Sequence, residues 1–297
     1  MYDMEELHKP VLISEVLGVL SPKLGESYLD LTAGYGGHAS EVLDLTRNYK
    51  DSVLIDRDAF AVEYLRKKYQ KNGEFPEIVN GDFYGSVLKE VECGKTFDLI
   101  LADFGVSSPQ LDMKERGFSF RESGPLDMRM DKSQKLTAEE IVNHYPETKL
   151  AEIFEKYGEE RPGNARRLAR EIVHARPFRT TLELADFIKQ KSRYSKIHPA
   201  TRIFQAIRIV VNDELGQIEK TLPLIPKALK PGGRVAIITF HSLEDRLVKQ
   251  YFKEASSFGE ESELSIINKT PIVASAVELL SNPRARSAKL RAARKRV

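Results

Sequence analysis

Short apolar runs alternate with amphipathic stretches along the first third of this chain. The runs are typical of buried strands, whereas the stretches repeat their apolar residues at helical spacing. An amphipathic segment from Pro10 to Leu20 precedes them. This alternation predicts a parallel sheet with crossover helices. The expected strands are Tyr28–Leu31, Val53–Ile55, Glu77–Val79 and Phe97–Ala102, and the expected helices are Gly37–Leu45, Ala59–Tyr69 and Gly85–Val91.

The pattern changes between about Met113 and Pro199, where helical stretches and loops occur without strand signals. Two capping boxes, Thr137 with Glu140 and Thr180 with Glu183, mark helix starts there. We therefore predict an α/β protein with a doubly wound, mostly parallel sheet. Residues 1–112 and 200–297 form its main domain, and residues 113–199 form a helical insertion domain. The helices expected in the insertion are 138–143, 147–157, 162–175 and 181–191.

The alternation returns in the last third of the chain. Helices are expected over 200–211 and up to Leu229, followed by a Pro-Gly-Gly turn at 231–233. The next expected elements are a strand at Arg234–Phe240, a helix from near Leu243, and an edge hairpin of Leu264–Asn268 with Ala288–Ala292. These elements would complete the sheet of the main domain.

The segment 287–294 shows a period of two. Its apolar face holds Ala288, Leu290 and Ala292, and its basic face holds Lys289 and Arg291. This is the pattern of a half-buried strand. We expect the basic face to lie toward phosphates, so that replacing both cations by Gln changes stability by less than about 0.5 kcal/mol.

Positive charge is concentrated in two regions, although the formal net charge is only +2. Pro283–Val297 holds seven Lys or Arg and no acid, and Arg161–Arg208 holds twelve against three acids. Such regions favour a polyanionic partner, although solvated helix faces and a frayed tail explain the charge equally well. A single cysteine, an N-terminus without an apolar run, and no apolar stretch of about 18 residues predict a cytoplasmic protein without a membrane partner.

Carboxylates stand beside the C-terminal ends of all four strands expected in the first third of the chain: Asp30, Asp56, Asp82 and Asp103. In open parallel sheets this edge lines the crevice in which ligands bind. We therefore expect the functional site at this edge.

The glycine-rich segment Asp30–Ala39 joins the first strand to its helix. Glycines there permit positive φ and let the backbone approach a ligand closely. Gly34-x-Gly36-x-x-Ala39, with Asp56 twenty residues after Gly36, also satisfies the dinucleotide fingerprint. A nicotinamide dehydrogenase and a tight turn without a ligand are therefore alternatives at this point.

Two features favour S-adenosylmethionine over a dinucleotide. Asp30 suits a cationic sulfonium or ammonium group better than a pyrophosphate. Asp82 and Phe83 together could hydrogen-bond and stack an adenine. Asp56 would then accept from both ribose hydroxyls as a charged acceptor. The alternative for Asp82 is the N-cap of a helix.

The loop Asp103–Gln110 follows the fourth strand and would face the cofactor. A base amine is a poor nucleophile, and an acceptor for its N–H localises the lone pair during methyl transfer. Asp103 is the candidate acceptor, with holding the loop or the cofactor as its alternative role. Methylating a pyrimidine ring carbon usually requires a thiolate, but Cys93 precedes the fourth strand at the opposite edge. An exocyclic amine of an RNA base is therefore the simplest target.

The histidines give weaker signals. His241 and Ser242 stand at the end of the fifth strand. We expect Ser242 to cap the next helix with Asp245. His241 could contact the substrate, but its role is left undecided. The spacings among His144, His174 and His198 do not match those of metal ligands. No metal site is therefore expected.

Specific motifs recur along the chain at His8–Leu12, Gly36–His38, Asp103–Asp112, Arg116–Phe120, Pro125–Asp131, Tyr157–Arg161, His198–Arg202, Phe204–Ala206, Val211–Leu215, Phe240–Arg246 and Asn282–Arg291. At these stretches the chain resembles the bacterial small-subunit ribosomal RNA cytosine-N4 methyltransferases, and the resemblance covers nearly its whole length. Its departures from the family pattern are small: Tyr35 precedes the glycine pair, and Phe104 stands where Leu is common.

The resemblance implies a class I methyltransferase fold and S-adenosylmethionine-dependent N4-methylation of a cytidine in the decoding region of 16S ribosomal RNA. The expected partner is this RNA within the small ribosomal subunit, with the insertion domain recognising it; a homodimer stays open. The second hypothesis is a non-catalytic RNA-binding assembly factor, which the intact glycines and strand-end carboxylates disfavour. The family's cofactor contacts map onto Gly36, Gly37, His38, Asp56, Phe83, Asp103 and Gln110.

Overall fold

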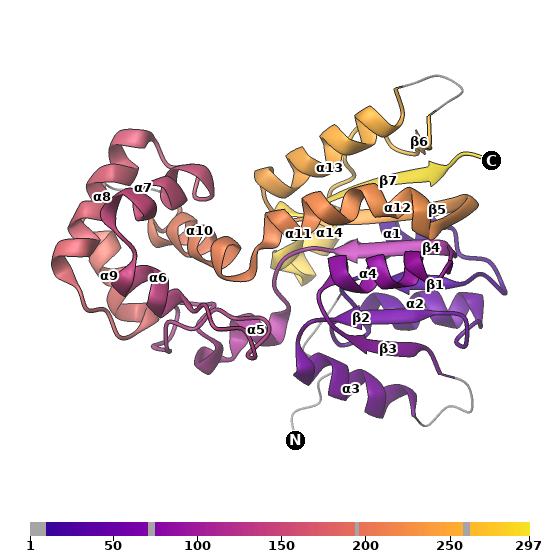
Figure 1. The fold of residues 1–297 in the computed structure, drawn as a ribbon, viewed down its shortest axis with the longest axis horizontal. Helices are drawn as coiled ribbons and strands as arrows, with labels where there is room; N and C mark the ends of the chain where they lie inside the picture. The colour runs from indigo at the N-terminus through magenta and orange to yellow at the C-terminus, as the bar shows by residue number, and fades with distance from the viewer. Residues whose placement is uncertain (1–9, 71–74, 194–195, 258–261) are drawn as a thin grey trace. The chain divides into compact units, whose positions relative to one another are not determined.

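The computed structural model describes residues 10–70, 75–193, 196–257 and 262–297 (Figure 1). It forms two compact units, one from the chain up to Gly105 together with Leu215–Val297, the other from Val106–Glu214. The first, the sheet unit, contains all the described strands; the second, the helical unit, is built from helices and loops. The N-terminal residues used against a signal peptide, and His8 and Lys9 of the first matching stretch, lie outside the described residues.

The sheet has seven described strands in the order β3-β2-β1-β4-β5-β7-β6. Neighbours from β3 through β5 run parallel, whereas β7 pairs antiparallel with both β5 and β6. The first four strands confirm the expectation: each begins at the expected residue. The strands are β1 (Tyr28–Asp30), β2 (Val53–Asp56), β3 (Glu77–Asn80), β4 (Phe97–Asp103), β5 (Leu229–Thr239), β6 (Leu264–Ile266) and β7 (Lys289–Lys295).

Alternate residues along the central strands pack into two cores, one on each face of the sheet. Ile100 and Ile237 belong to one core with Val87 of α4 and Val248 of α13. Leu99, Leu101 and Ile238 belong to the other core, which includes apolar residues of α1, α2 and α3. The helices of this unit are α1 (Ile13–Leu20), α2 (Gly37–Thr46), α3 (Ala59–Tyr69), α4 (Phe83–Glu92), α11 (Glu214–Thr221), α12 (Ile225–Ala228), α13 (Ser242–Ala255) and α14 (Ala276–Ser281).

The fifth strand differs from the expectation. The Pro-Gly-Gly sequence was expected as a turn before a strand at Arg234, but β5 already starts at Leu229. Leu229 pairs with Phe97 and Arg234 with Leu99, so the intervening residues bulge out of the ladder. Gly232 adopts φ +76°, a left-handed conformation that glycine tolerates at little cost. The Pro-Gly-Gly sequence is therefore a bulge within the strand.

The helical unit begins earlier and ends later than the insertion domain expected at 113–199. Residues 106–112 belong to it, and so does α10, because Ile203, Phe204 and Ile207 are buried in the core of this unit. The expected N-caps are confirmed: the Thr137 and Thr180 side chains accept from the Glu140 and Glu183 amides at the starts of α6 and α9. Its helices are α5 (Ser108–Asp112), α6 (Ala138–His144), α7 (Glu147–Lys156), α8 (Pro162–Ala175), α9 (Thr181–Gln190) and α10 (Ala200–Asn212).

Across the described residues, every helix is too short or too polar to cross a membrane.

Candidate active site

Strand-end carboxylates gather at one edge of the sheet unit. Asp30, Asp56 and Asp103 are the last residues of β1, β2 and β4, and Asp82 follows β3 directly before α4. The parallel register joins these ends, because Asp30 pairs with Leu54 and Leu101 and Asp56 pairs with Asn80. The predicted edge of carboxylates is confirmed, and it lies where α/β sheets bind ligands.

The end of β1 is fixed by a buried hydrogen-bond network. The Tyr28 hydroxyl donates to Asp30 Oδ2 at 2.7 Å, and the Thr32 amide donates to Asp30 Oδ1 at 3.1 Å. Thr32 Oγ1 in turn accepts from the Asp103 amide at 2.6 Å. Burial raises the pKa of Asp30 to about 7, although both hydrogen bonds oppose this shift. Sequence analysis missed Tyr28 and Thr32, whose only signal is their proximity to Asp30.

Asp56 supports the glycine loop directly. Its Oδ2 accepts from the Gly34 amide at 2.8 Å, and its Oδ1 accepts from the Asp58 amide at 2.8 Å. Burial raises the pKa of Asp56 to about 6. Each carboxylate oxygen has a second lone pair, so both retain capacity to accept from a ribose hydroxyl. Asp56 therefore couples the shape of the glycine loop to any ligand bound beside it.

The glycine loop requires glycine on steric grounds. Gly34 and Gly36 have φ of +53° and +78°. A Cβ on Gly36 would lie 2.9 Å from Leu65 Cδ2, and one on Gly37 would lie 3.3 Å from Pro10 Cβ. Gly36 is the N-cap residue of α2 and makes no side-chain cap. The loop thus presents bare backbone at the start of a helix, as close approach to a ligand requires.

Asp103 and His38 face each other at this edge. His38 Nε2 lies 2.9 Å from the Val11 carbonyl, which can only accept, so Nε2 carries the proton. His38 Nδ1 lies 3.8 Å from Asp103 Oδ2. Asp103 Oδ1 is buried and has no hydrogen-bond partner among the described residues. Burial, together with the carboxylates of Asp30 and Glu244, raises the pKa of Asp103 well above its ordinary value.

Phe83 and Asp82 lie at the start of α4. Asp82 caps this helix by accepting from the Gly85 amide at 2.8 Å. The alternative role expected for Asp82, the N-cap of a helix, is therefore confirmed. Phe83 packs against Phe104 with ring centroids 5.4 Å apart and is only partly buried. One aromatic face beside the carboxylate edge is thus held in place by the core.

Gln110 is the one mapped cofactor contact that belongs to the helical unit. It is buried, and its Oε1 accepts from the Ser107 amide at 3.1 Å in the capping box of α5. The other mapped contacts, from Gly36 to Asp103, lie together at the carboxylate edge of the sheet unit.

The expected cap of α13 is wrong by one residue. His241 is the N-cap, and its Nδ1 accepts from the Glu244 amide at 3.4 Å. Glu244 Oε2 accepts from the Phe240 and His241 amides at 2.7 and 3.3 Å. The capping box therefore pairs His241 with Glu244, instead of Ser242 with Asp245.

The basic face of β7 also differs from the expectation. The half-buried strand is confirmed, but Arg291 is only 7% exposed and its Nε donates to Asp245 Oδ1 at 2.7 Å. Lys289 Nζ donates to Asp245 Oδ2 at 3.1 Å. This face is neutralised by α13 and does not lie open toward phosphates.

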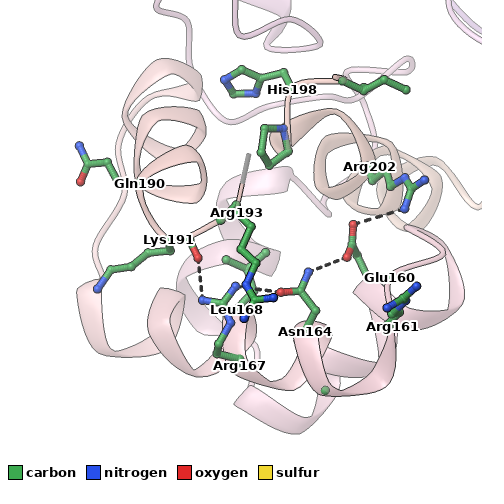
Figure 2. A pocket seen from close by; sticks show the side chains of 14 residues that line it. Glu160, Arg161, Asn164, Arg167, Leu168, Gln190, Lys191, Arg193, His198 and Arg202 are labelled. Carbon is green, nitrogen blue, oxygen red and sulfur yellow. Dashed lines mark hydrogen bonds and ion pairs between the residues drawn. The ribbon is translucent and has the colours of Figure 1, made fainter. Parts of the chain in front are cut away.

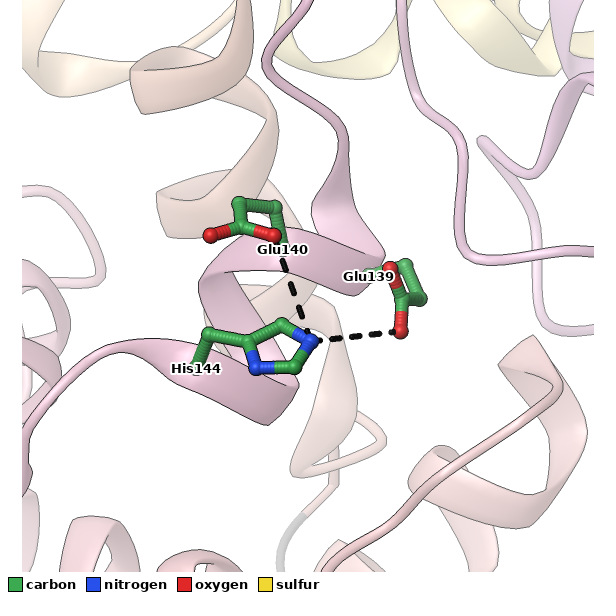
Figure 3. A group of neighbouring side chains, drawn as sticks. All are labelled: Glu139, Glu140 and His144. Carbon is green, nitrogen blue, oxygen red and sulfur yellow. Dashed lines mark ion pairs between the residues drawn. The ribbon is translucent and has the colours of Figure 1, made fainter.

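The exposed group Glu139, Glu140 and His144 lies on α6 (Figure 3). His144 Nε2 is 3.8 and 3.9 Å from oxygens of the two glutamates. All three side chains are about half exposed or more, and exposed ion pairs of this kind contribute little. The absence of a metal site stays a prediction.

Comparison with known proteins identifies the family of this chain. The sequence profile of the MraW methylase family matches residues 5–296. The chain belongs to the MraW methylase family. Ribosomal RNA small subunit methyltransferase H of Trichormus variabilis is 48% identical, with 97% of this chain and 92% of the relative covered. The enzyme of the same name from Synechocystis sp. is 48% identical over 97% of this chain and 93% of its own length.

Among solved structures, the N-methyltransferase NodS of Bradyrhizobium japonicum is similar at 10% identity and a TM-score of 0.44, covering 96% of this chain and 94% of NodS. That likeness is distant, and the assignment rests on the sequence relatives. Family membership confirms the predicted methyltransferase and its α/β fold class. The nicotinamide dehydrogenase, which the glycine fingerprint had left open, is thereby wrong.

Proposed function

We propose that this chain transfers a methyl group from S-adenosylmethionine to N4 of a cytidine in the decoding region of 16S ribosomal RNA. The observation that carries this proposal is the Asp103 carboxylate, which ends β4 beside the glycine loop with one buried oxygen unpartnered. Such an oxygen can accept a hydrogen bond from an amine without first losing a protein partner. The relatives named ribosomal RNA small subunit methyltransferase H support the substrate class.

The chemistry of the carboxylate edge fits the cofactor. The bare backbone from Gly36 to His38 would hold its methionine part, and Asp30 and Asp56 favour a cation nearby. Asp56 would accept from the ribose hydroxyls, and Phe83 would contact the adenine. Gln110 is a further cofactor contact that the family pattern implies. When bound, S-adenosylmethionine supplies a methyl group on an electrophilic sulfonium.

Asp103 would act on the acceptor amine. Its carboxylate accepts an amine N–H, which localises the nitrogen lone pair for in-line attack and stabilises the positive charge that develops on nitrogen. Burial raises the pKa of Asp103, and a nearby cation such as a sulfonium would favour its ionised form. His38, held by the Val11 carbonyl, lies 3.8 Å from Oδ2, whereas the unpartnered Oδ1 is the oxygen that would accept from the substrate.

The substrate is proposed to be 16S ribosomal RNA within the small ribosomal subunit, in the cytoplasm, with the helical unit recognising it. The charge of that unit supports this assignment, because Arg161–Arg208 carries twelve Lys or Arg against three acids. A homodimer is compatible with this proposal and is tested by light scattering.

Cofactor binding gives the first prediction. Asp56→Ala should weaken S-adenosylmethionine binding by about 1.5–3 kcal/mol, the range for hydrogen bonds to a charged group. Asp56→Asn should lose less, because its amide oxygen still accepts. Isothermal titration calorimetry measures both, with NADH as the negative control. Tight NADH binding, or wild-type affinity in Asp56→Ala, would contradict the proposed cofactor site.

A further inference from the structure

The helical unit contains a basic cavity whose lining comes entirely from residues 160–202. Its volume of about 770 Å³ lies within the range of about 300–1,000 Å³ that ligand pockets occupy. The start of α8, the end of α9 and the start of α10 surround it (Figure 2). Its charged lining consists of Arg161, Arg167, Lys191, Arg193, Arg202 and Glu160.

A chain of polar contacts crosses the cavity and fixes part of its lining (Figure 2). Arg167 donates to the Lys191 carbonyl at 2.7 Å and to Asn164 Oδ1 at 2.8 Å. Asn164 Nδ2 donates to Glu160 Oε2 at 2.6 Å, and Glu160 Oε1 lies 3.8 Å from Arg202 Nη1. The single carboxylate of the lining is therefore already engaged, and the arrangement requires little ordering when a ligand binds.

The remaining cations of the cavity are available to an anion. Arg161 and Arg193 are exposed and form no ion pair with any described carboxylate. Lys191 pairs with Glu171 at 2.8 Å, but both side chains are 37–41% exposed, so this pair contributes little and can exchange. Guanidinium groups bind phosphate oxygens in pairs. The cavity thus has the chemistry of a phosphate site.

Its walls are not only cationic. Ile197, 59% exposed, and the buried Leu168 line the same space. A free phosphate ion would leave this apolar surface exposed to water, whereas the sugar or base of a nucleotide would cover it. Volume, charge and apolar wall together fit a short stretch of an RNA strand.

We propose that this cavity binds a sugar-phosphate segment of single-stranded RNA, with Arg161 and Arg193 on phosphates and Ile197 against a sugar or base. This inference rests on the proposed RNA substrate. It adds an anchoring site in the helical unit to the methyl-transfer site of the sheet unit.

The test compares two double variants that remove equal charge. Arg161→Gln/Arg193→Gln alters the cavity, while Arg121→Gln/Lys135→Gln removes exposed cations of the same unit outside it. Binding of a fluorescent single-stranded RNA oligonucleotide is measured by anisotropy across a salt series. Two lost phosphate contacts should reduce the salt slope by about 1.4 and the affinity by about 10–25-fold at 0.1 M salt. The control variant should change affinity by less than about twofold, and calorimetry should show both binding S-adenosylmethionine as the wild type does.

Equal losses in the two double variants, or an unchanged salt slope in the cavity variant, would overturn the inference. Methylation of isolated small-subunit particles is measured in parallel, so that failure of the cavity inference can be distinguished from failure of the proposed function. A cavity variant that methylates particles with wild-type KM contradicts the cavity alone. A wild-type protein that binds the oligonucleotide through the cavity but transfers no methyl group contradicts the proposed function alone.

Discussion

Asp103→Asn is expected to lower kcat for methyl transfer by about 10²–10³-fold, the loss seen when one preorganised electrostatic group is removed from a transition state. The substitution keeps the size and shape of the side chain but removes the charge that stabilises the reacting nitrogen. RNA and S-adenosylmethionine affinities should change by less than about tenfold, because this interaction strengthens mainly in the transition state. Single-turnover kinetics and calorimetry separate the two effects.

His38→Gln is the matched comparison for Asp103, because it alters the neighbour at 3.8 Å and leaves the carboxylate intact. Its loss in kcat should be smaller than that of Asp103→Asn. If Asp103→Asn instead lost cofactor affinity and turnover equally, Asp103 would be a cofactor-binding residue, which is the alternative role expected from the sequence.

The second large effect concerns stability. Arg291→Gln should lower the free energy of unfolding by about 3 kcal/mol, because it leaves Asp245 with a buried charge and one partner fewer. Lys289→Gln should cost less than about 1 kcal/mol, since the Lys289 side chain is 40% exposed and exposed pairs contribute little. Urea unfolding at neutral pH measures both. The sequence alone predicted that both substitutions change stability very little, because it assumed that the basic face of β7 is exposed. The ion pairs with Asp245 change that prediction.

The same pair predicts a dependence on pH. Burial opposes ionisation of Asp245, but hydrogen bonds from Arg291 and Lys289 outweigh it and hold its pKa below the ordinary value. A carboxyl with a lowered folded pKa stabilises fully above its unfolded pKa of about 3.9 and loses this contribution as pH falls through the folded value. The stability gap between wild type and Arg291→Gln should therefore narrow below about pH 4. A gap that stays constant down to pH 3 would contradict the role of this ion pair.

The sequence was sufficient to place the first four strands, because local signals agreed there. Short β-rich runs set β1 to β4, and a carboxylate ends or follows each strand. The error at α13 arose because serine is the commoner cap, whereas the spacing of His241 and Glu244 carried the correct capping-box signal. Glu244 occupies the N3 position of the capping box only when His241 is the N-cap.

Other features depend on tertiary packing that periodicity does not contain. The alternation in β7 predicted two faces correctly, but it could not indicate that Asp245 of α13 covers the basic one. The boundary of the helical unit moved because α10 buries its apolar side in the core of that unit. The cavity of that unit joins the ends of three helices, and no sequence spacing marks it.

The central claim is the identity of the methylated atom. The protein is incubated with methyl-labelled S-adenosylmethionine and small ribosomal subunits from cells lacking this activity, and the RNA is digested to nucleosides for mass spectrometry. The account predicts label in N4-methylcytidine from the decoding region, and its loss in Asp103→Asn. Label on a pyrimidine ring carbon, or no transfer to RNA by protein that binds the cofactor, would contradict it.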